Sequence, residues 1–505
     1  MQADPLDTLR AVTSEQVISD RAHTHGWRRF LVEPARPSRI RERPNAYWFV
    51  VATVCIGAFM NQLDASIVTV AFPTLQHQFH ASIGAVTWVG LSYLLVLIGL
   101  ITAVGRFADM VGRKLLYIYG FLVFIVGSAL CGTATSLGAL DGFRVLQGVG
   151  AAMIQANSVA IIVLAVPKAR LGRSIGVQGA AQALGLALGP TLGGLLIALG
   201  GWRLIFYVNV PVGLLGTALG WFLIPRSGHL QPKTAFDWAG LTLFFPAIAA
   251  LLSAVSFGDR EGWTSPGIVG LFCATTALGG AFIWREQRAR NPMLDLSLFR
   301  RVPFSAGISS GLLSYLLLFG VLFVVPFYLE RGLGQSVGRA GLELAAAPIA
   351  LGLTAPLAGR LADRLGARPF TVAGMALAAA IMGLLVILHG SVWQIVAELA
   401  LVGIALGLFT PPNNAAIMGS VPVEQSGVAS GILNMTRGLG TAMGLAFSGL
   451  VFGLVAGPEN ASARSVTRGF VACAAFLGVV AVAAMALALL RGRGELRSDH
   501  LSQIE

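Results

Sequence analysis

The sequence predicts an all-α integral membrane protein with fourteen transmembrane helices. Of its 505 residues, 55% are hydrophobic and only 11% are charged, and the mean hydropathy is +0.76. A soluble domain carries about 25% charged residues, so an aqueous globular enzyme is excluded. The apolar residues form runs of about 20, the length of a spanning helix, instead of the alternating stretches of about ten that build an outer-membrane barrel.

Fourteen apolar runs are each long enough to cross a bilayer, where only a helix or a closed barrel satisfies the backbone. We place them near residues 47–72, 84–104, 115–136, 138–164, 174–199, 204–224, 238–257, 265–284, 303–328, 340–358, 369–389, 394–416, 427–456 and 469–490. The four cysteines lie inside such runs without a shared short spacing, so we expect neither a disulfide framework nor a metal site.

Lysine and arginine concentrate in one set of loops, for example at Arg113, Lys114 and Arg301, and are sparse in the other set. The positive-inside rule therefore predicts that both termini are cytoplasmic, in a multi-pass protein of the cell inner (plasma) membrane. The formal net charge of +12 then serves topology and contact with anionic lipid, and we expect no nucleic-acid partner.

A loop sequence occurs twice. Residues 105–113, GRFADMVGR, recur as residues 359–368, GRLADRLGAR, 254 positions later. Repeated halves are typical of secondary transporters, which bind substrate at the midplane between them. We therefore expect a tail (1–46), a six-helix half (47–225), an inserted helix pair with its loops (226–302), a second six-helix half (303–490) and a tail (491–505). The inserted pair has no charge inside its apolar stretches and should lie outside the central cavity.

Five motifs occur in order along the chain. They are LDASIVTVAFP at 63–73, the loop at 105–114, RVLQGVG at 144–150, the run from Gly185 to Gly194, and WRLIFYVNVPVG at 202–213. This set resembles the fourteen-helix drug:H⁺ antiporters of the major facilitator superfamily over about residues 47–490. The resemblance implies the major facilitator fold, with two pseudo-symmetric six-helix halves plus two inserted helices, and multidrug efflux by alternating access.

Two charged residues lie deep in the N-terminal half. Asp64 is about 9 residues before Pro73 and Arg144 is about 8 residues into the fourth run, so both are roughly 12–13 Å below the outer surface. A charge there costs at least about 2.5–3.5 kcal/mol and should face a cavity or a partner. Loss of water disfavours a carboxylate and a nearby guanidinium favours it, so Asp64 could exchange a proton for a cationic substrate. A permanent Asp–Arg brace between helices is the alternative.

The remaining candidate residues are taken mainly from the motifs. Gln62 and Arg437 complete the proton-coupling and substrate group; the run around Arg437 resembles one common in the family, and bracing and conformational roles both remain open for it. Glu343 and Glu398, near the outer ends of their helices, are expected as interfacial groups, with a proton relay as the alternative. A conformational latch is expected from Gly105, Asp109, Gly112, Arg113, Asp363 and Arg364, because a carboxylate at a helix end can pair with arginine. The antiporter helix motif is Gly185, Gly189, Pro190, Gly193 and Gly194, whose small residues allow close helix contact.

These observations predict a proton-coupled exporter of amphipathic drugs or toxic small molecules, acting as a monomer with protons and the lipid bilayer as its other partners. The alternatives are an exporter of an endogenous lipid or metabolite and a non-transporting receptor. The sequence has no P-loop, and its histidines lie in tails, loops or helix ends. A primary pump and a serine hydrolase, which needs an adjacent base, are therefore disfavoured. We expect no enzymatic activity and no cofactor.

Overall fold

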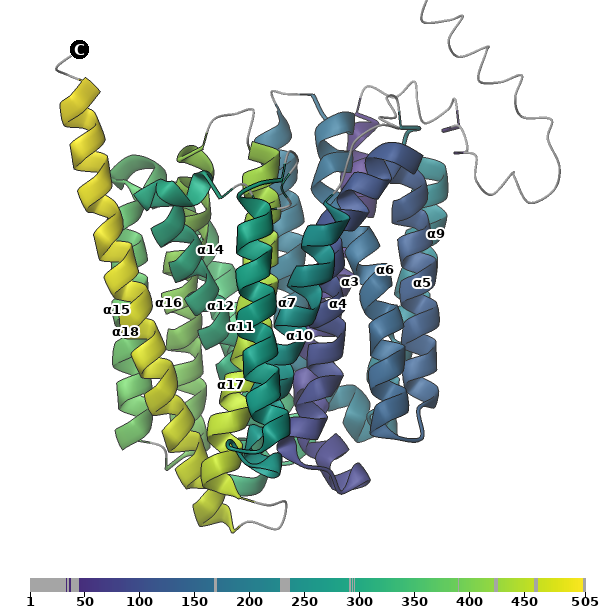
Figure 1. Cartoon of the computed structure of the whole chain (residues 1–505). Coiled ribbons are helices and arrows are strands. Elements are labelled where there is room, and N and C mark those ends of the chain that lie inside the picture. Colours follow the sequence, from purple (N-terminus) through teal and green to yellow (C-terminus); the bar gives the residue numbers. More distant parts are fainter. Residues whose placement is uncertain are drawn as a thin grey trace, which may run out of the picture.

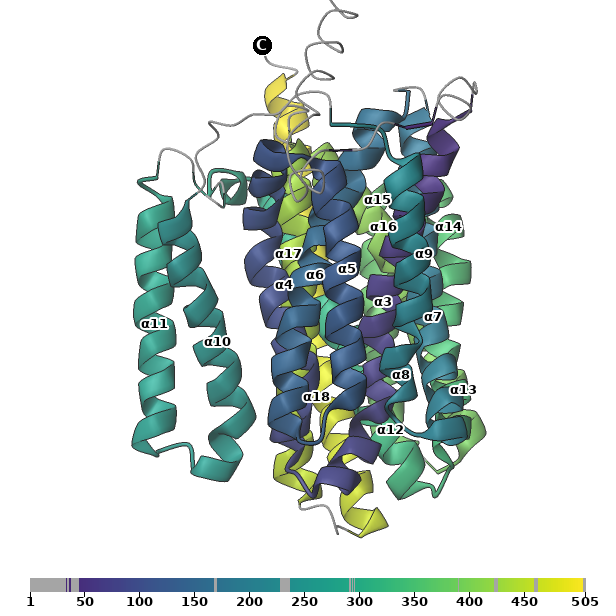
Figure 2. The ribbon, with the colours of Figure 1, turned by 90° about the vertical axis from the view of Figure 1, so that its right-hand side faces the viewer.

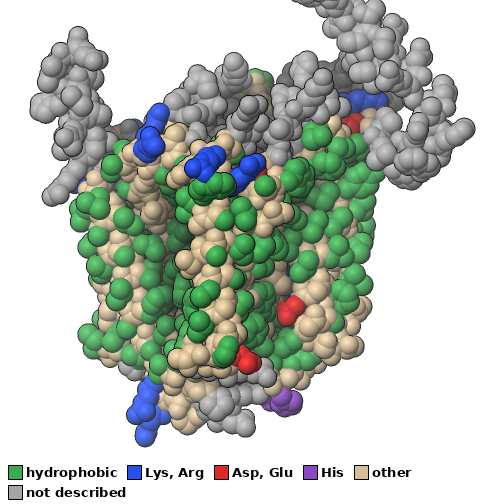
Figure 3. Space-filling model, in the orientation of Figure 1, with side chains coloured by type: hydrophobic (Ala, Val, Ile, Leu, Met, Phe, Trp, Pro, Cys, Tyr) green, Lys and Arg blue, Asp and Glu red, His purple; other side chains and the backbone are tan. Residues whose placement is uncertain are grey.

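The protein is described from a computed structural model. It describes residues 33, 36–37, 45–167, 170–227, 237–289, 292, 294, 296–388, 390–421, 426–457 and 462–502. Within these residues, fourteen helical spans are long and apolar enough to cross a membrane, and the spans run side by side as one bundle (Figure 1). Hydrophobic side chains cover most of the visible flank (Figure 3). The predicted fold class is confirmed.

The N-terminal half contains six spans, the last of which is interrupted at Val208. They are α3 (Tyr47–Phe79), α4 (Ile83–Val111), α5 (Arg113–Thr133), α6 (Leu137–Ala165), α7 (Leu171–Gly200), and α8 (Leu204–Tyr207) with α9 (Asn209–Leu223). Serine side chains cap two of these helices: Ser82 accepts from the backbone N–H of Ala85, and Ser136 accepts from that of Ala139. Such caps satisfy backbone donors that the first helical turn leaves unpaired.

The C-terminal half also contains six spans. After η4 (Leu298–Arg300) they are α12 (Val302–Phe327) with η5 (Tyr328–Gly332), α13 (Val337–Leu344) with α14 (Ala346–Leu365), α15 (Ala367–Ile387), α16 (Val392–Gly419), α17 (Ser426–Ala456) and α18 (Ala463–Ser502). Equivalent helices pair in the same way in each half: α3 with α7 corresponds to α12 with α17, and α4 with α6 corresponds to α14 with α16. An even number of spans brings the start of α3 and the end of α18 to one end of the bundle, here called the termini end; the opposite end is called the far end.

The repeated loop has a glycine with a positive φ at the same place in both copies. Gly112 ends α4 with φ of 118°, and Gly366 ends α14 with φ of 85°. Side chains rarely tolerate a positive φ, so glycine suits both helix ends. The two positions are 254 residues apart, the offset of the sequence repeat.

The two helices between the halves lie at the edge of the bundle. Helices α10 (Trp238–Glu261) and α11 (Pro266–Glu286) form a hairpin beside the other spans (Figure 2). Helix α10 packs against α4 and α17, and the rings of Trp88 and Phe257 stack at 6.0 Å between α4 and α10. Neither helix of the pair contributes a residue to the described cavities below.

Helix α3 is longer than the sequence suggested. We expected it to end near Pro73, but the helix continues to Phe79 and Pro73 is buried within it. Proline removes one backbone hydrogen bond, which a helix packed among neighbours in a membrane tolerates. The equal-depth estimate for Asp64 and Arg144 therefore started from the wrong helix end, although the two side chains do meet.

Candidate functional site

A buried polar cluster joins α3 to α6. Asp64 and Arg144 are 0% and 1% exposed, and a nitrogen of the guanidinium lies 2.6 Å from carboxylate Oδ2. Gln147, one helical turn after Arg144, closes a ring of three side chains. Its Nε2 donates to Asp64 Oδ1 at 2.8 Å, and its Oε1 accepts from Arg144 at 2.7 Å.

Two further helices complete this cluster. Asn209 at the start of α9 donates to Asp64 Oδ1 at 2.9 Å and to the hydroxyl of Ser128 in α5 at 3.1 Å. The Nε of Arg144 donates to the backbone carbonyl of Val89 at 2.8 Å, and the Tyr93 ring lies 4.2 Å from the guanidinium carbon.

The cluster satisfies both charges inside an apolar bundle. A buried ion is tolerated when it is paired and its remaining donors and acceptors are hydrogen-bonded, which is the case for both oxygens of Asp64. A proton arriving at Asp64 would cancel the negative charge and leave Arg144 without its counter-ion. Protonation would therefore change the forces that hold α3, α6 and α9 together.

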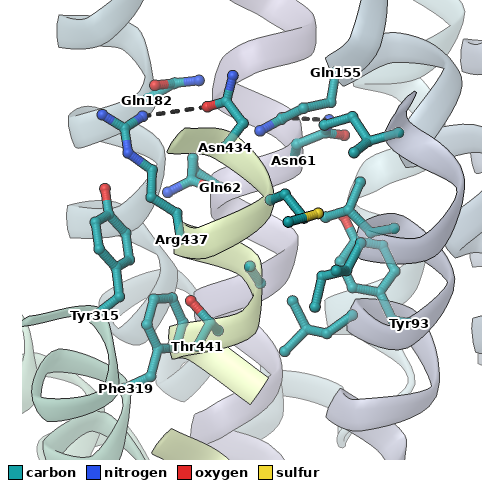
Figure 4. Close-up of a pocket in the computed structure, with 17 residues that line it drawn as sticks. Asn61, Gln62, Tyr93, Gln155, Gln182, Tyr315, Phe319, Asn434, Arg437 and Thr441 are labelled. Carbon is teal, nitrogen blue, oxygen red and sulfur yellow. Dashed lines mark hydrogen bonds between the residues drawn. The ribbon is translucent and has the colours of Figure 1, made fainter. Parts of the chain in front are cut away.

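A central cavity lies beside this cluster, between the two halves (Figure 4). Its volume is about 50 Å³, and its polar lining consists mainly of side-chain amides and Arg437. A larger cavity of about 750 Å³ lies between α7 and α14, and it shares Gln62, Gln182, Tyr315 and Arg437 with the central one. Gly179 and Gly359 line the larger cavity, which places it toward the termini end.

The four candidate coupling and substrate residues fall into two groups. Asp64 and Arg144 meet in the buried cluster, and neither lines the described cavities. Gln62 and Arg437 line the cavities instead. The cluster and the cavity are neighbours, because Tyr93 lines the central cavity and also covers Arg144.

The glycines of the antiporter motif divide between two partners. A Cβ on Gly185 would collide with the backbone of Phe59, and a Cβ on Gly189 would collide with the hydroxyl of Ser66. Both partners are in α3. A Cβ on Gly193 would lie 2.9 Å from Ile67, also in α3. Gly194 faces the other half: its Cβ would lie 3.1 Å from the Cα of Gly341 in α13.

Glycine thus allows α7 to approach both halves at once, as small residues do at membrane helix contacts. Pro190 is buried in the middle of α7, and its carbonyl is the nearest atom to a Cβ placed on Gly341. The α7–α13 contact lies at the far end. The two halves are therefore in close contact at the far end and separated by the larger cavity toward the termini end.

The sequence matches the family model described as Major Facilitator Superfamily over residues 54–307 and 307–503. The chain belongs to the major facilitator superfamily. Among the solved structures it is similar to a bacterial homolog of the human lysosomal transporter Spinster in an inward-facing, unoccupied conformation. The TM-score is 0.67 at 16% identity, covering 90% of this chain and 98% of that one. That likeness concerns the fold alone.

Several curated relatives are transport or resistance proteins. The multidrug resistance protein Stp of Mycobacterium tuberculosis (strain CDC 1551 / Oshkosh) is 36% identical over 401 residues, covering 78% of this chain and 74% of the relative. The riboflavin transporter RibZ of Clostridioides difficile (strain 630) is 32% identical, covering 79% and 87%. The tetracenomycin C resistance and export protein of Streptomyces glaucescens is 31% identical, covering 82% and 77%. This major facilitator protein is thus a membrane transporter with drug-resistance relatives.

The structure describes only part of the predicted conformational latch. The side chains of Asp109 and Asp363 lie outside the described residues, so the predicted pairing of carboxylate and arginine stays a prediction. Arg364 is exposed, and a Cβ on Gly105 would have no neighbour within 4 Å among the described residues. The start of α5, directly after Gly112, does make contacts: the backbone N–H of Arg113 donates to Ser227 Oγ at 3.0 Å.

The expectation that Glu398 lies at the membrane interface is wrong. Glu398 in α16 is 2% exposed and does not extend to the surface. Gln394, one turn earlier, donates to its Oε1 at 3.3 Å, whereas Oε2 has no hydrogen-bond partner among the described residues. Helix α16 packs between α14 and α15, which buries this side chain despite its position near the helix start.

Sequence reasoning missed Gln147 and Asn209 as partners of Asp64. Both lie inside motifs that were recognised, at 144–150 and 202–213, but only their general resemblance was used. The signals were available. Gln147 is three residues after Arg144 and so lies on the same helix face, and Asn209 is an amide in an otherwise apolar segment.

Proposed function

We propose that this transporter exports amphipathic drugs or other toxic small molecules in exchange for protons, by alternating access. The observation that carries the proposal is the position of one carboxylate. Asp64 is buried in a closed ion-pair cluster directly beside a cavity that opens between the halves. Protonation at such a site is coupled to helix packing, and helix packing determines which end of the cavity is open.

We further propose that the protein acts as a monomer in the plasma membrane, with both termini cytoplasmic. The larger cavity then faces the cytoplasm, where a drug for export is bound. A proton entering the cell gains about 2.3 kcal/mol per 100 mV of membrane potential, before any contribution of the pH gradient. This source of free energy needs no nucleotide, in keeping with the lack of a P-loop in the sequence.

A second candidate is export of an endogenous metabolite by the same mechanism. The relative named a riboflavin transporter favours it. A resistance panel in an efflux-deficient host separates the two. Export of drugs predicts resistance to several unrelated amphipathic compounds, whereas a dedicated metabolite exporter gives resistance to none and changes the amount of one metabolite in the medium.

The decisive test uses everted membrane vesicles and a compound to which the host has become resistant. We expect accumulation of the compound only when a pH gradient is present, and its loss when a protonophore is added. Vesicles from the same host without the protein are the control. Equal accumulation with and without the gradient would contradict proton antiport, and a receptor would show no accumulation at all.

A further inference from the structure

Among the described residues, one charged side chain lines the cavities between the halves, and its charge is positive. Three cavities are described: the central one, the larger one, and a small one of about 10 Å³ between α12, α16 and α17. Arg437 lines all three, and no aspartate or glutamate lines any of them among the described residues. The nearest buried carboxylate on the N-terminal side, Asp64, is fully enclosed by its own partners.

Among the residues that the structure describes, no carboxylate lies beside Arg437 in the cavities that it lines. Its strongest described contact is a long hydrogen bond of 3.4 Å to Asn434 Oδ1, and its Nε is buried without a partner among the described residues. The Tyr315 ring lies 5.7 Å from its central carbon. Figure 4 shows the guanidinium between Gln182 and Asn434, at the edge of the central cavity. Arg437 is half-buried and faces the cavities with no carboxylate beside it among their described lining residues, so a ligand with a negatively charged oxygen could pair with its guanidinium there.

The rest of the lining fits an amphipathic ligand. Four further amides, from Asn61, Gln62, Gln155 and Gln182, offer both donors and acceptors to a polar edge. Tyr315 and Phe319 offer aromatic faces to an apolar ring system. Arginine binds a carboxylate or phenolate through charge-assisted, often paired, hydrogen bonds. An organic cation would meet the positive charge of Arg437 and find no carboxylate in these cavities.

We infer that this transporter selects amphipathic organic anions, with an aromatic body and a carboxylate or phenolate, and that Arg437 binds the anionic group. The inference rests on the export function proposed above and specifies its substrate class. Exchange of one monovalent anion outward for one proton inward moves two positive charges inward per cycle. The membrane potential would therefore drive export of such a substrate more strongly than export of a neutral one.

The test compares two dyes that share a xanthene ring but differ in charge: fluorescein, which is anionic at pH 8, and rhodamine 6G, which is cationic. Binding to the purified full-length protein in detergent is followed by fluorescence anisotropy, with empty micelles subtracted. We expect fluorescein to bind at least about tenfold more tightly than rhodamine 6G, the effect of one charge-assisted contact. The Arg437→Gln variant should lose about that factor for fluorescein alone, and Arg437→Lys should keep part of it.

The matched control is Arg464→Gln, which removes one positive charge from an exposed position outside the cavities. It should leave both affinities unchanged. Tighter binding of rhodamine 6G, equal binding of the dyes, or fluorescein binding that Arg437→Gln does not weaken would each overturn the inference. If Arg437→Gln does not fold, the dye preference of the native protein and of Arg437→Lys decides.

Binding in detergent requires no gradient, so the two proposals can fail separately. Anion-selective binding without pH-driven transport of any compound would overturn proton antiport and leave the selectivity intact. Gradient-driven export of rhodamine 6G by a protein that does not bind fluorescein would overturn the anion selectivity and leave proton antiport intact.

Discussion

A Cβ placed on Gly338 of α13 would lie 3.6 Å from the Cβ of Ala198 in α7. The two residues belong to opposite halves and face each other at the far end, where the halves are in contact. A Cβ–Cβ distance of about 3.5–4.5 Å is that of a disulfide. Alternating access requires these residues to separate in every cycle.

The first prediction uses this pair. With the four native cysteines replaced by alanine, Ala198→Cys and Gly338→Cys together should form a disulfide on mild oxidation and stop transport. A reducing agent should restore it. Each single cysteine variant, treated with the same oxidant, is the control. Full transport by a protein shown by mass spectrometry to be cross-linked would exclude opening at this end.

The second prediction concerns the charge on Asp64. Asp64→Asn keeps the size of the side chain but cannot ionise, so transport driven by a pH gradient should be lost in proteoliposomes. Arg144 also loses its partner, and breaking a buried pair costs about 3–5 kcal/mol, so the melting temperature should fall. Asp237→Asn is the matched control, because its partner Arg285 is 42% exposed and lies in the peripheral hairpin.

A double variant distinguishes coupling from bracing. Asp64→Asn with Arg144→Gln leaves no buried charge unpaired, so part of the lost stability should return. If Asp64 carries the proton, gradient-driven transport stays lost. If such transport returned along with stability, the pair would be a brace and nothing more.

The third prediction tests the packing of α7 on α3. In Gly185→Ala the new methyl group collides with the backbone carbonyl of Phe59, which cannot rotate away. Overpacking of this kind costs about 1–3 kcal/mol, and the melting temperature and transport rate should both decrease. Gly179→Ala on the same helix has open space within 4 Å and should leave the melting temperature unchanged. Equal behaviour of the two variants would show that the α3–α7 contact is not tight in the membrane.

The fourth prediction concerns topology. In a protein without native cysteines, Ser462→Cys before α18 should react with a membrane-impermeant maleimide in intact cells, because that loop lies at the far end. Gln287→Cys, exposed after α11 at the termini end, should react only after lysis. The opposite pattern would invert the orientation proposed here.

The helices could be predicted from sequence because an apolar run of about 20 residues has to be helical in lipid. Their ends were less predictable: α4 continues to Val111 and α14 to Leu365, past the expected ends near residues 104 and 358. One proline was misjudged. Pro73 lies inside α3 although the expected helix ended before it, whereas Pro190 lies inside α7 as expected. A helix packed in a membrane tolerates the missing N–H, and that packing is a tertiary property.

The candidate site was predictable in part, because lipid also constrains any charged residue inside an apolar run. A charge in an apolar run, such as Asp64 or Arg144, signals a buried partner, but the chain gives no direction in which to look for it. Gln147 and Asn209 complete the cluster through contacts between segments separated by 83 and 145 positions from Asp64. The enclosed position of Asp64, next to the cavity but not in it, follows from that completed ring of hydrogen bonds.

The hairpin of α10 and α11 covers one side of the bundle and leaves the opposite side without such a cover. Helix α10 packs on α4 from one half and α17 from the other, so it lies along one of the two seams where the halves meet. The larger cavity lies at the other seam, between α7 and α14. Under the proposed export function, an amphipath that enters this cavity from the lipid tails would have to pass along α7 and α14, because α10 covers the other seam.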